Sequence, residues 1–77
     1  MEINVSMIST TKVLFKGKAK SVILPGEEGI FEIAPFHKRI MSRLISGTLI
    51  IDEQSFDIRR GIAKVINNIV TILIEEK

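Results

Sequence analysis

The chain has 77 residues, of which 45% are hydrophobic and 26% charged, a balance that fits one globular domain and excludes a disordered segment. The formal net charge of +2 is too small to indicate a nucleic-acid partner by itself, and the absence of cysteine excludes disulfides and thiolate metal sites. The sequence shows neither a signal-peptide pattern nor an apolar run long enough to span a membrane. Because the chain is short, we expect a single domain over residues 1–77. Isoleucine dominates the apolar residues, which favours strands because branched side chains suit a pleated surface.

The first part of the chain alternates with the period of a β-strand. Residues 2–8 place apolar side chains at every second position, which predicts a half-buried strand. Turn-prone residues follow at 9–12, and extended structure resumes over residues 13–25. Pro25 is expected to end this strand, because proline has no N–H to donate to a ladder.

The middle of the chain reads as short strands separated by turns. Residues 25–29 (PGEEG) predict a tight turn whose two glycines can take positive φ, and residues 30–35 predict a short strand. Residues 37–47 combine helical spacing with short length, and we interpret them as a strand leading into a glycine. Residues 48–58 predict a hairpin around an acidic turn at 52–55.

The last third carries the clearest local signal. Residues 61–66 and 69–76 flank Asn67 and Asn68, and asparagine tolerates left-handed conformations, so a two-residue hairpin turn is predicted. In total, the chain holds roughly eight or more short strands with turn signals about every 8–12 residues, the pattern of an all-β antiparallel sandwich or barrel.

The candidates for chemistry are few. His37 is the single histidine, and a catalytic triad would need it to meet a distant serine; a lone histidine beside a turn is more often a surface or interface residue. Glu27, Glu28 and Glu32 would serve as paired acid–base carboxylates only in a concave and partly dry site, whereas carboxylates on an exposed turn are solvated. We therefore expect no catalytic residue, no metal and no cofactor.

A basic stripe offers a second function. Lys16, Lys18 and Lys20 share one strand face, as in a small OB-like β-barrel that binds single-stranded nucleic acid. Such readers also need exposed aromatic side chains for base stacking, so a solvated or edge-protecting lysine face is the preferred interpretation. Phe36, between a proline and the histidine, fits either a contact surface or a cap on one end of the core.

Several motifs then occur in a specific order along the chain. They are "VILPGEEG" at 22–29, "PFH" at 35–37, "LISG" at 44–47 and "GIAKVINNIVTIL" at 61–73. With the opening residues, which include Phe-x-Gly at 15–17, this order resembles the N-terminal β-sandwich domain of the F-type ATP synthase epsilon subunit. The similarity is colinear over nearly the whole chain.

The resemblance implies a flattened-barrel-like fold of two packed five-stranded sheets. It implies a non-catalytic central-stalk (rotor) subunit of a proton-translocating ATP synthase, which couples rotation of the c-ring to the gamma subunit. The implied location is peripheral, at the cytoplasmic face of the bacterial inner membrane or the equivalent side of an organelle membrane. The implied partners are gamma and the c-ring, with no nucleic acid, and the isolated protein is expected to be a monomer.

The resemblance also implies contact residues. Those that match positions meeting the c-ring loops are Glu28, Gly29, Ile30 and Phe31. Those that match positions facing gamma are Ser9, Thr10 and His37. The chain departs from the family pattern at Ile30 (commonly acidic), at Glu32 and Phe36 (commonly glycine), near Arg39 (a proline) and at Arg60 (glycine before Gly61). The family usually continues after this domain as a helical hairpin. A chain that ends at Lys77 is therefore expected to be a short form without the hairpin. No inhibition of ATP hydrolysis is assigned to this short form.

Overall fold

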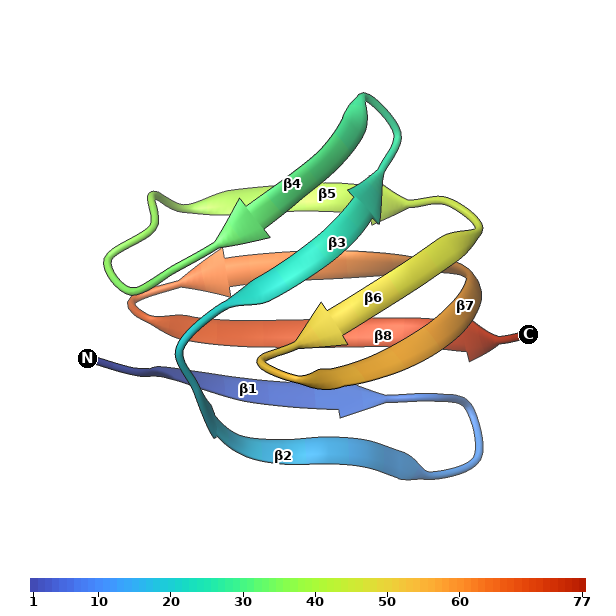
Figure 1. The fold of residues 1–77 in the computed structure, drawn as a ribbon, viewed down its shortest axis with the longest axis horizontal. Helices are drawn as coiled ribbons and strands as arrows, with labels where there is room; N and C mark the ends of the chain where they lie inside the picture. The colour runs from blue at the N-terminus through green and yellow to red at the C-terminus, as the bar shows by residue number, and fades with distance from the viewer.

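The computed structural model describes residues 1–77 and is built of strands without any helix. The eight strands are β1 (Ile3–Ile8), β2 (Val13–Ala19), β3 (Val22–Gly26), β4 (Gly29–Ile33), β5 (Ile40–Leu44), β6 (Gly47–Ile51), β7 (Gln54–Ile66) and β8 (Ile69–Glu76). Figure 1 shows them crossing one another in two layers. No helical segment long and apolar enough to cross a membrane is present.

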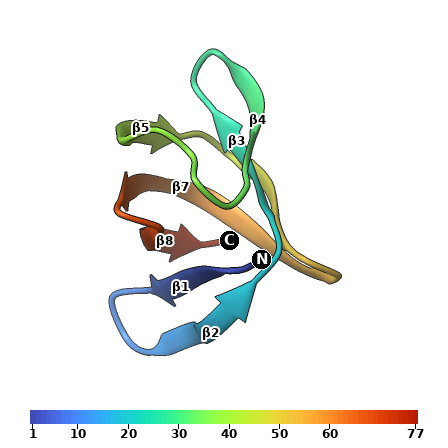
Figure 2. The ribbon, with the colours of Figure 1, turned by 90° about the vertical axis from the view of Figure 1, so that its left-hand side faces the viewer.

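The two layers share one long strand. The first layer has the order β2-β1-β8-β7-β5, and the second contains β4, β3, β6 and the first part of β7. Strand β7 runs for 13 residues, where the sequence suggests two separate strands, and its register shifts between Ile58 and Arg60 as it passes between the layers. The layers face each other in Figure 2. The predicted all-β sandwich is confirmed, but the second layer holds four strands rather than five, and it reaches four only because β7 contributes to both layers.

One strand pair runs against the expectation of a wholly antiparallel fold. Strand β1 pairs antiparallel with β2 but parallel with β8, with Asn4 opposite Ile69 and Ile8 opposite Leu73. Local alternation decides which face of a strand is buried and leaves the direction of its neighbour open. Strands β2 and β4 each have a single partner, so the sheet is flattened with two free edges and does not close into a barrel.

The core lies between the layers and is aliphatic. Its 16 buried residues are Ile3, Val5, Met7, Ala19, Val22, Leu24, Ile33, Leu44, Leu49, Ile51, Ile58, Ala63, Val65, Val70, Ile72 and Ile74. They come from all the strands at every second position, as the alternating burial of β1 and β8 illustrates. No side-chain nitrogen or oxygen atom is buried without a hydrogen-bond partner.

The segment 13–25 is not one strand, and Pro25 does not end it. The chain leaves β2 at Lys20 and Ser21, whose N–H groups donate to Asp52 Oδ1 at 2.9 and 3.1 Å, and then crosses into the second layer. Pro25 lies inside β3, opposite Ile30. Its carbonyl accepts the Ile45 N–H at 2.8 Å, so the strand uses the acceptor that proline retains.

The turns are shorter than expected in two places. The turn predicted over 25–29 contains only Glu27–Glu28, and the one predicted over 52–55 contains only Asp52–Glu53. Asp52 takes a φ of 53°, which lets the chain reverse in two residues. The predicted turn at Asn67–Asn68 is confirmed, with φ values of 49° and 64°.

Candidate functional site

Three shallow hollows run side by side along β5, with volumes of about 440, 540 and 290 Å³. The first two share Glu27 and Arg43, and the second and third share Ile40 and Met41. We call this surface the β5 belt, and it consists of Thr10, Gly26–Phe31, Arg39–Ile45, Arg60–Ile62, Lys64, Ile66 and Leu73–Glu75. It exists because β5 pairs with β7 along its length but meets the second layer only where Leu44 faces Gly26.

The β3–β4 hairpin forms one wall of the belt. Gly26 is required there, because a Cβ atom at this position would lie 2.7 Å from the ring of Phe31, which packs on the core. Gly29 has a φ of 126°, a conformation that side chains rarely adopt. The tip therefore presents Glu28 outward, followed by Ile30 with 79% of its surface exposed. All four predicted c-ring contact residues lie together around the second hollow.

The turn after β1 supplies Thr10 to the other end of the belt. The Ser9 hydroxyl accepts the N–H groups of Thr11 and Lys12, both at 3.3 Å, and only 9% of Ser9 is exposed. Thr10 at the tip of this turn is exposed and lines the first hollow. Of the two predicted contact residues here, Ser9 shapes the turn and Thr10 is available to a partner.

His37 lies in the loop between β4 and β5. Its N–H donates to the Ala34 carbonyl at 3.2 Å, and its Nδ1–H donates to the Lys38 carbonyl at 2.8 Å. The preceding N–H, that of Phe36, donates to the side-chain Oδ1 of Asn68 at 3.1 Å. These bonds hold the half-buried imidazole next to the β7–β8 turn, where Figure 1 shows the loop and the turn at the same end of the sandwich.

The structure does not bring Thr10 and His37 together. The turn of Thr10 follows Ile8, which pairs with Leu73, whereas the loop of His37 is bonded to the turn that precedes Ile69. Four residue steps separate these positions on β8, which is about 13 Å for a strand. One partner that contacts both residues must therefore lie along the first layer rather than at one end of it.

No catalytic arrangement surrounds the histidine. The one hydrogen bond of its ring goes to a main-chain carbonyl, and none of the three hollows is lined by His37. Glu27, Glu28 and Glu32 are exposed, as expected for solvated carboxylates. No group of three or more His, Cys, Asp or Glu side chains is placed to hold a metal ion.

The lysine stripe faces water, as predicted. Lys16 and Lys18 on β2, and Lys20 directly after it, are exposed, and β2 is the edge strand at the opposite side of the first layer from β5. The aromatic residue of this strand, Phe15, packs against the core, so the stripe offers no ring for base stacking. Lysines on an edge strand hinder pairing with another sheet, which accounts for their placement. The nucleic-acid interpretation finds no support here.

Sequence reasoning missed an apolar row on the outer face of the first layer. Ile8, Leu73 and Ile62 are neighbours across β1, β8 and β7, with exposed fractions of 38%, 46% and 45%. The sequence did contain a signal for this row. In residues 69–74 both the odd-numbered and the even-numbered positions, which point to opposite faces of the strand, are apolar apart from one threonine. A strand of this kind is typical of a sheet that is covered on both faces.

Comparisons with known proteins agree on one family. Residues 2–77 match the family model described as the β-sandwich domain of the ATP synthase delta/epsilon chain. The ATP synthase epsilon chain of Leptospira borgpetersenii is 37% identical over 76 residues, covering 94% of this chain and 60% of that protein. The epsilon chain of Bordetella avium is 36% identical, covering 92% of this chain and 54% of its own length. The chain thus spans little more than half the length of these relatives.

Solved structures share the fold at low sequence identity. A chain of the Euglena gracilis mitochondrial ATP synthase (OSCP/F1/c-ring) superposes with a TM-score of 0.90 at 18% identity, covering 97% of this chain and 51% of that one. A chain of the central stalk and c-ring of the Tetrahymena thermophila enzyme gives a TM-score of 0.86 at 15% identity, covering 99% of this chain and 65% of that one. With the family match over residues 2–77, the chain belongs to the family of ATP synthase delta/epsilon chain β-sandwich domains.

Proposed function

We propose that this protein is a non-catalytic central-stalk subunit of a proton-translocating F-type ATP synthase, which couples rotation of the c-ring to the gamma subunit. The observation that carries the proposal is the family match over residues 2–77, together with relatives that are named ATP synthase epsilon chains. The superposed Tetrahymena chain comes from an assembly described as central stalk and c-ring.

The β5 belt supports a docking role for this surface. A subunit that couples two partners must bind them, and exposed apolar side chains provide such binding surface. Five aliphatic side chains along the belt have exposed fractions between 45% and 79%: Ile30, Met41, Ile45, Ile62 and Leu73. Clustered exposed aliphatic side chains of this kind mark protein interaction sites. The same surface offers no enclosed pocket in which a reaction would be protected from water.

Two contacts are assigned within this proposal. Glu28, Gly29, Ile30 and Phe31 meet the loops of the c-ring through the tip of the β3–β4 hairpin. Thr10 and His37, with Ser9 shaping the turn of Thr10, meet the gamma subunit along the first layer. The complex sits at the cytoplasmic face of a bacterial inner membrane or the equivalent side of an organelle membrane, and the isolated protein is a monomer without nucleic acid.

Co-purification with the gamma subunit from the same source tests the proposal. The unmodified protein should retain gamma on an affinity resin, and Thr10→Arg should reduce the retained amount at least about tenfold, because a long charged side chain would be desolvated at the contact. Lys18→Glu, on the edge strand at the far side of the layer, serves as the control and should retain gamma as the unmodified protein does. Failure of the unmodified protein to retain gamma would contradict the proposal.

A further inference from the structure

Phe36 combines two features that are unfavourable in an isolated protein. Its side chain is 72% exposed, and its φ is 66°, in the left-handed region that costs most residues energy. The conformation is held by the Asn68 side chain, whose Oδ1 accepts the Phe36 N–H at 3.1 Å and whose Nδ2–H donates to the Glu2 carbonyl at 2.8 Å. The alternative that Phe36 caps the core is therefore wrong. Strained backbone conformations of this kind cluster at functional sites, which makes the exposed Phe36 a candidate contact residue.

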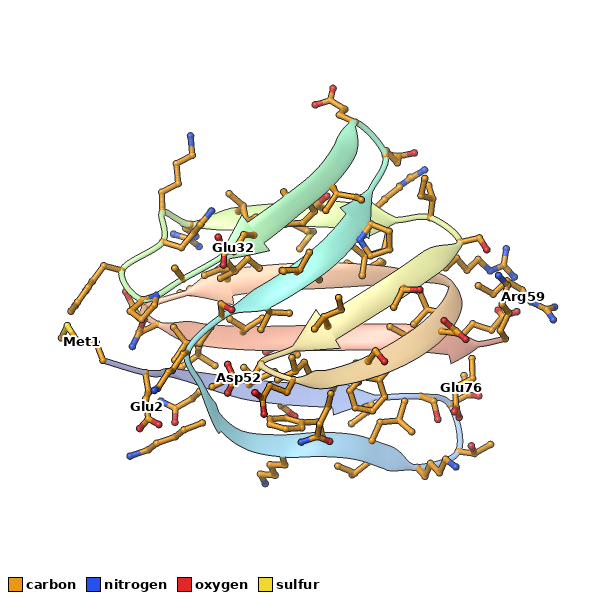
Figure 3. The ribbon with its side chains drawn as sticks, in the orientation of Figure 1. Met1, Glu2, Glu32, Asp52, Arg59 and Glu76 are labelled. Carbon is orange, nitrogen blue, oxygen red and sulfur yellow. The ribbon has the colours of Figure 1, made fainter.

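Three cations without an ion pair lie around this loop and the adjacent end of the belt. The ion pairs of the structure use Lys12, Arg59 and Arg60, and none involves Lys38, Arg39 or Lys64. Figure 3 places Met1 at one end of the sandwich and Arg59 and Glu76 at the other. The β4–β5 loop, which carries Phe36, lies at the same end as Met1.

Two of these cations share a hollow with aliphatic side chains. Arg39 and Lys64 line the third hollow of about 290 Å³ together with Ile40, Met41 and Ile66. Met41 faces Lys64 across the β5–β7 pair and is 71% exposed. The hollow therefore offers positive charge and apolar surface together, and its lining includes no carboxylate.

We infer that Phe36, Arg39, Lys64 and Met41 form a preorganised docking patch for a protein surface that presents carboxylates beside aliphatic side chains. This inference rests on the proposed function, and it names the surface of the gamma subunit that lies next to His37 as the occupant. The carboxylates pair with Arg39 and Lys64, and the aliphatic groups cover the Phe36 ring and the Met41 thioether.

The chemistry of the patch favours a protein over a nucleic acid. A strand of nucleic acid needs a track of cations with several stacking rings, whereas this end of the molecule exposes one ring and an aliphatic hollow. A mixed cationic and aliphatic surface matches the composition of protein interfaces, in which charge sets the orientation and buried apolar groups supply affinity.

A Phe36→Gly variant separates a binding role from a structural one. Glycine adopts a φ of 66° without strain, which stabilises the folded state. The greater backbone entropy of glycine in the unfolded chain offsets part of this gain, so the midpoint of thermal unfolding should rise by roughly 2–4 °C. Affinity for the gamma subunit from the same source, measured by calorimetry, should fall at least about tenfold because the anchor is lost. A variant that is less stable and binds gamma with unchanged affinity would overturn the inference.

Charge reversal tests the acidic character of the partner surface. Arg39→Glu and Lys64→Glu should each weaken gamma binding roughly 5–30-fold at low salt, and the difference from the unmodified protein should shrink as salt rises. Lys18→Glu makes the same change of charge on β2, outside the patch, and should alter the affinity less than about twofold.

The outcomes distinguish the inference from the function on which it rests. Absence of gamma binding by the unmodified protein would overturn the proposed function and the inference together. Binding that is equally strong in all three patch variants would overturn the inference alone. Salt-sensitive binding of a single-stranded oligonucleotide that Arg39→Glu abolishes would also overturn it, because the patch would then serve a nucleic acid.

Discussion

At the scale of single residues, Asn68 connects parts of the chain that are distant in sequence. Its carbonyl accepts the Asn4 N–H at 3.1 Å, while its side chain bonds Phe36 and Glu2. The sequence predicts the turn at Asn68, because the preference for left-handed φ is local. It does not predict these side-chain bonds, since their partners lie 32 and 66 residues away and are known only once the strands have paired.

Replacing Asn68 by glycine tests this connection without disturbing the turn. Asn68→Gly keeps the favourable left-handed φ and removes two side-chain hydrogen bonds, each worth about 0.5–1.5 kcal/mol. We expect it to lower the free energy of unfolding in urea by about 1–3 kcal/mol more than Asn67→Gly, a change in the same turn at an exposed residue with positive φ. The Phe36 amide should also exchange its hydrogen faster. Equal losses of stability in the two variants would contradict the role of the Asn68 side chain.

At the scale of elements, β7 determines how the two layers join. It pairs with β6 in the second layer through residues 54–58. In the first layer it pairs with β8 through residues 58–66 and with β5 through residues 61–65. The sequence favours two strands here, one ending at residue 58 and one over 61–66, whereas the structure joins them in one continuous strand in which Gly61 closely approaches β8. Local patterning located the strand segments, and the joining of two of them depends on contacts with β8 that the pattern does not contain.

A methyl group at Gly61 has no space. The Cβ atom would lie 2.6 Å from the Leu73 carbonyl oxygen and 2.9 Å from Ile74 Cγ2, and the carbonyl belongs to a paired strand that cannot shift easily. We expect Gly61→Ala to reduce the free energy of unfolding by about 1–3 kcal/mol, at the upper end of this range, as measured in urea. Gln54→Ala, at the exposed start of the same strand, should change it by less than about 0.5 kcal/mol. A Gly61→Ala protein as stable as the unmodified one would show that β7 and β8 are not packed as described.

At the scale of the whole molecule, the sandwich has an inner apolar face that folds it and an outer apolar row that is left uncovered. The inner face could be predicted, because alternation identifies buried positions on each strand. The β5 belt could not be predicted, because it depends on how two elements from different layers lie in space. Strand β5 and the β3–β4 hairpin pair only where Leu44 faces Gly26, and they diverge beyond that pair. A closely packed slab of this kind has little internal freedom, which is compatible with the proposed coupling role.

Substitutions at two neighbouring residues of β8 should affect stability and gamma binding separately. Ile72 is fully buried and Leu73 is 46% exposed on the outer row. Ile72→Ala should cost about 2–5 kcal/mol of unfolding free energy through the cavity it leaves. Leu73→Ser should stay within about 1 kcal/mol of the unmodified protein and yet weaken gamma binding, which calorimetry would measure. Leu73→Ser protein that binds gamma normally would exclude the outer row from the interface.

The central claim is that one rigid sandwich touches the c-ring with its hairpin tip and gamma along its first layer. Because the chain has no cysteine, a photoreactive label can be attached at one introduced cysteine at a time and the protein assembled into the ATP synthase of its source. Labels at Glu28→Cys should yield cross-links to the c-ring, labels at Thr10→Cys and His37→Cys should yield cross-links to gamma, and a label at Lys18→Cys should yield neither. Identical products from all four sites, or no product with either partner, would contradict the account.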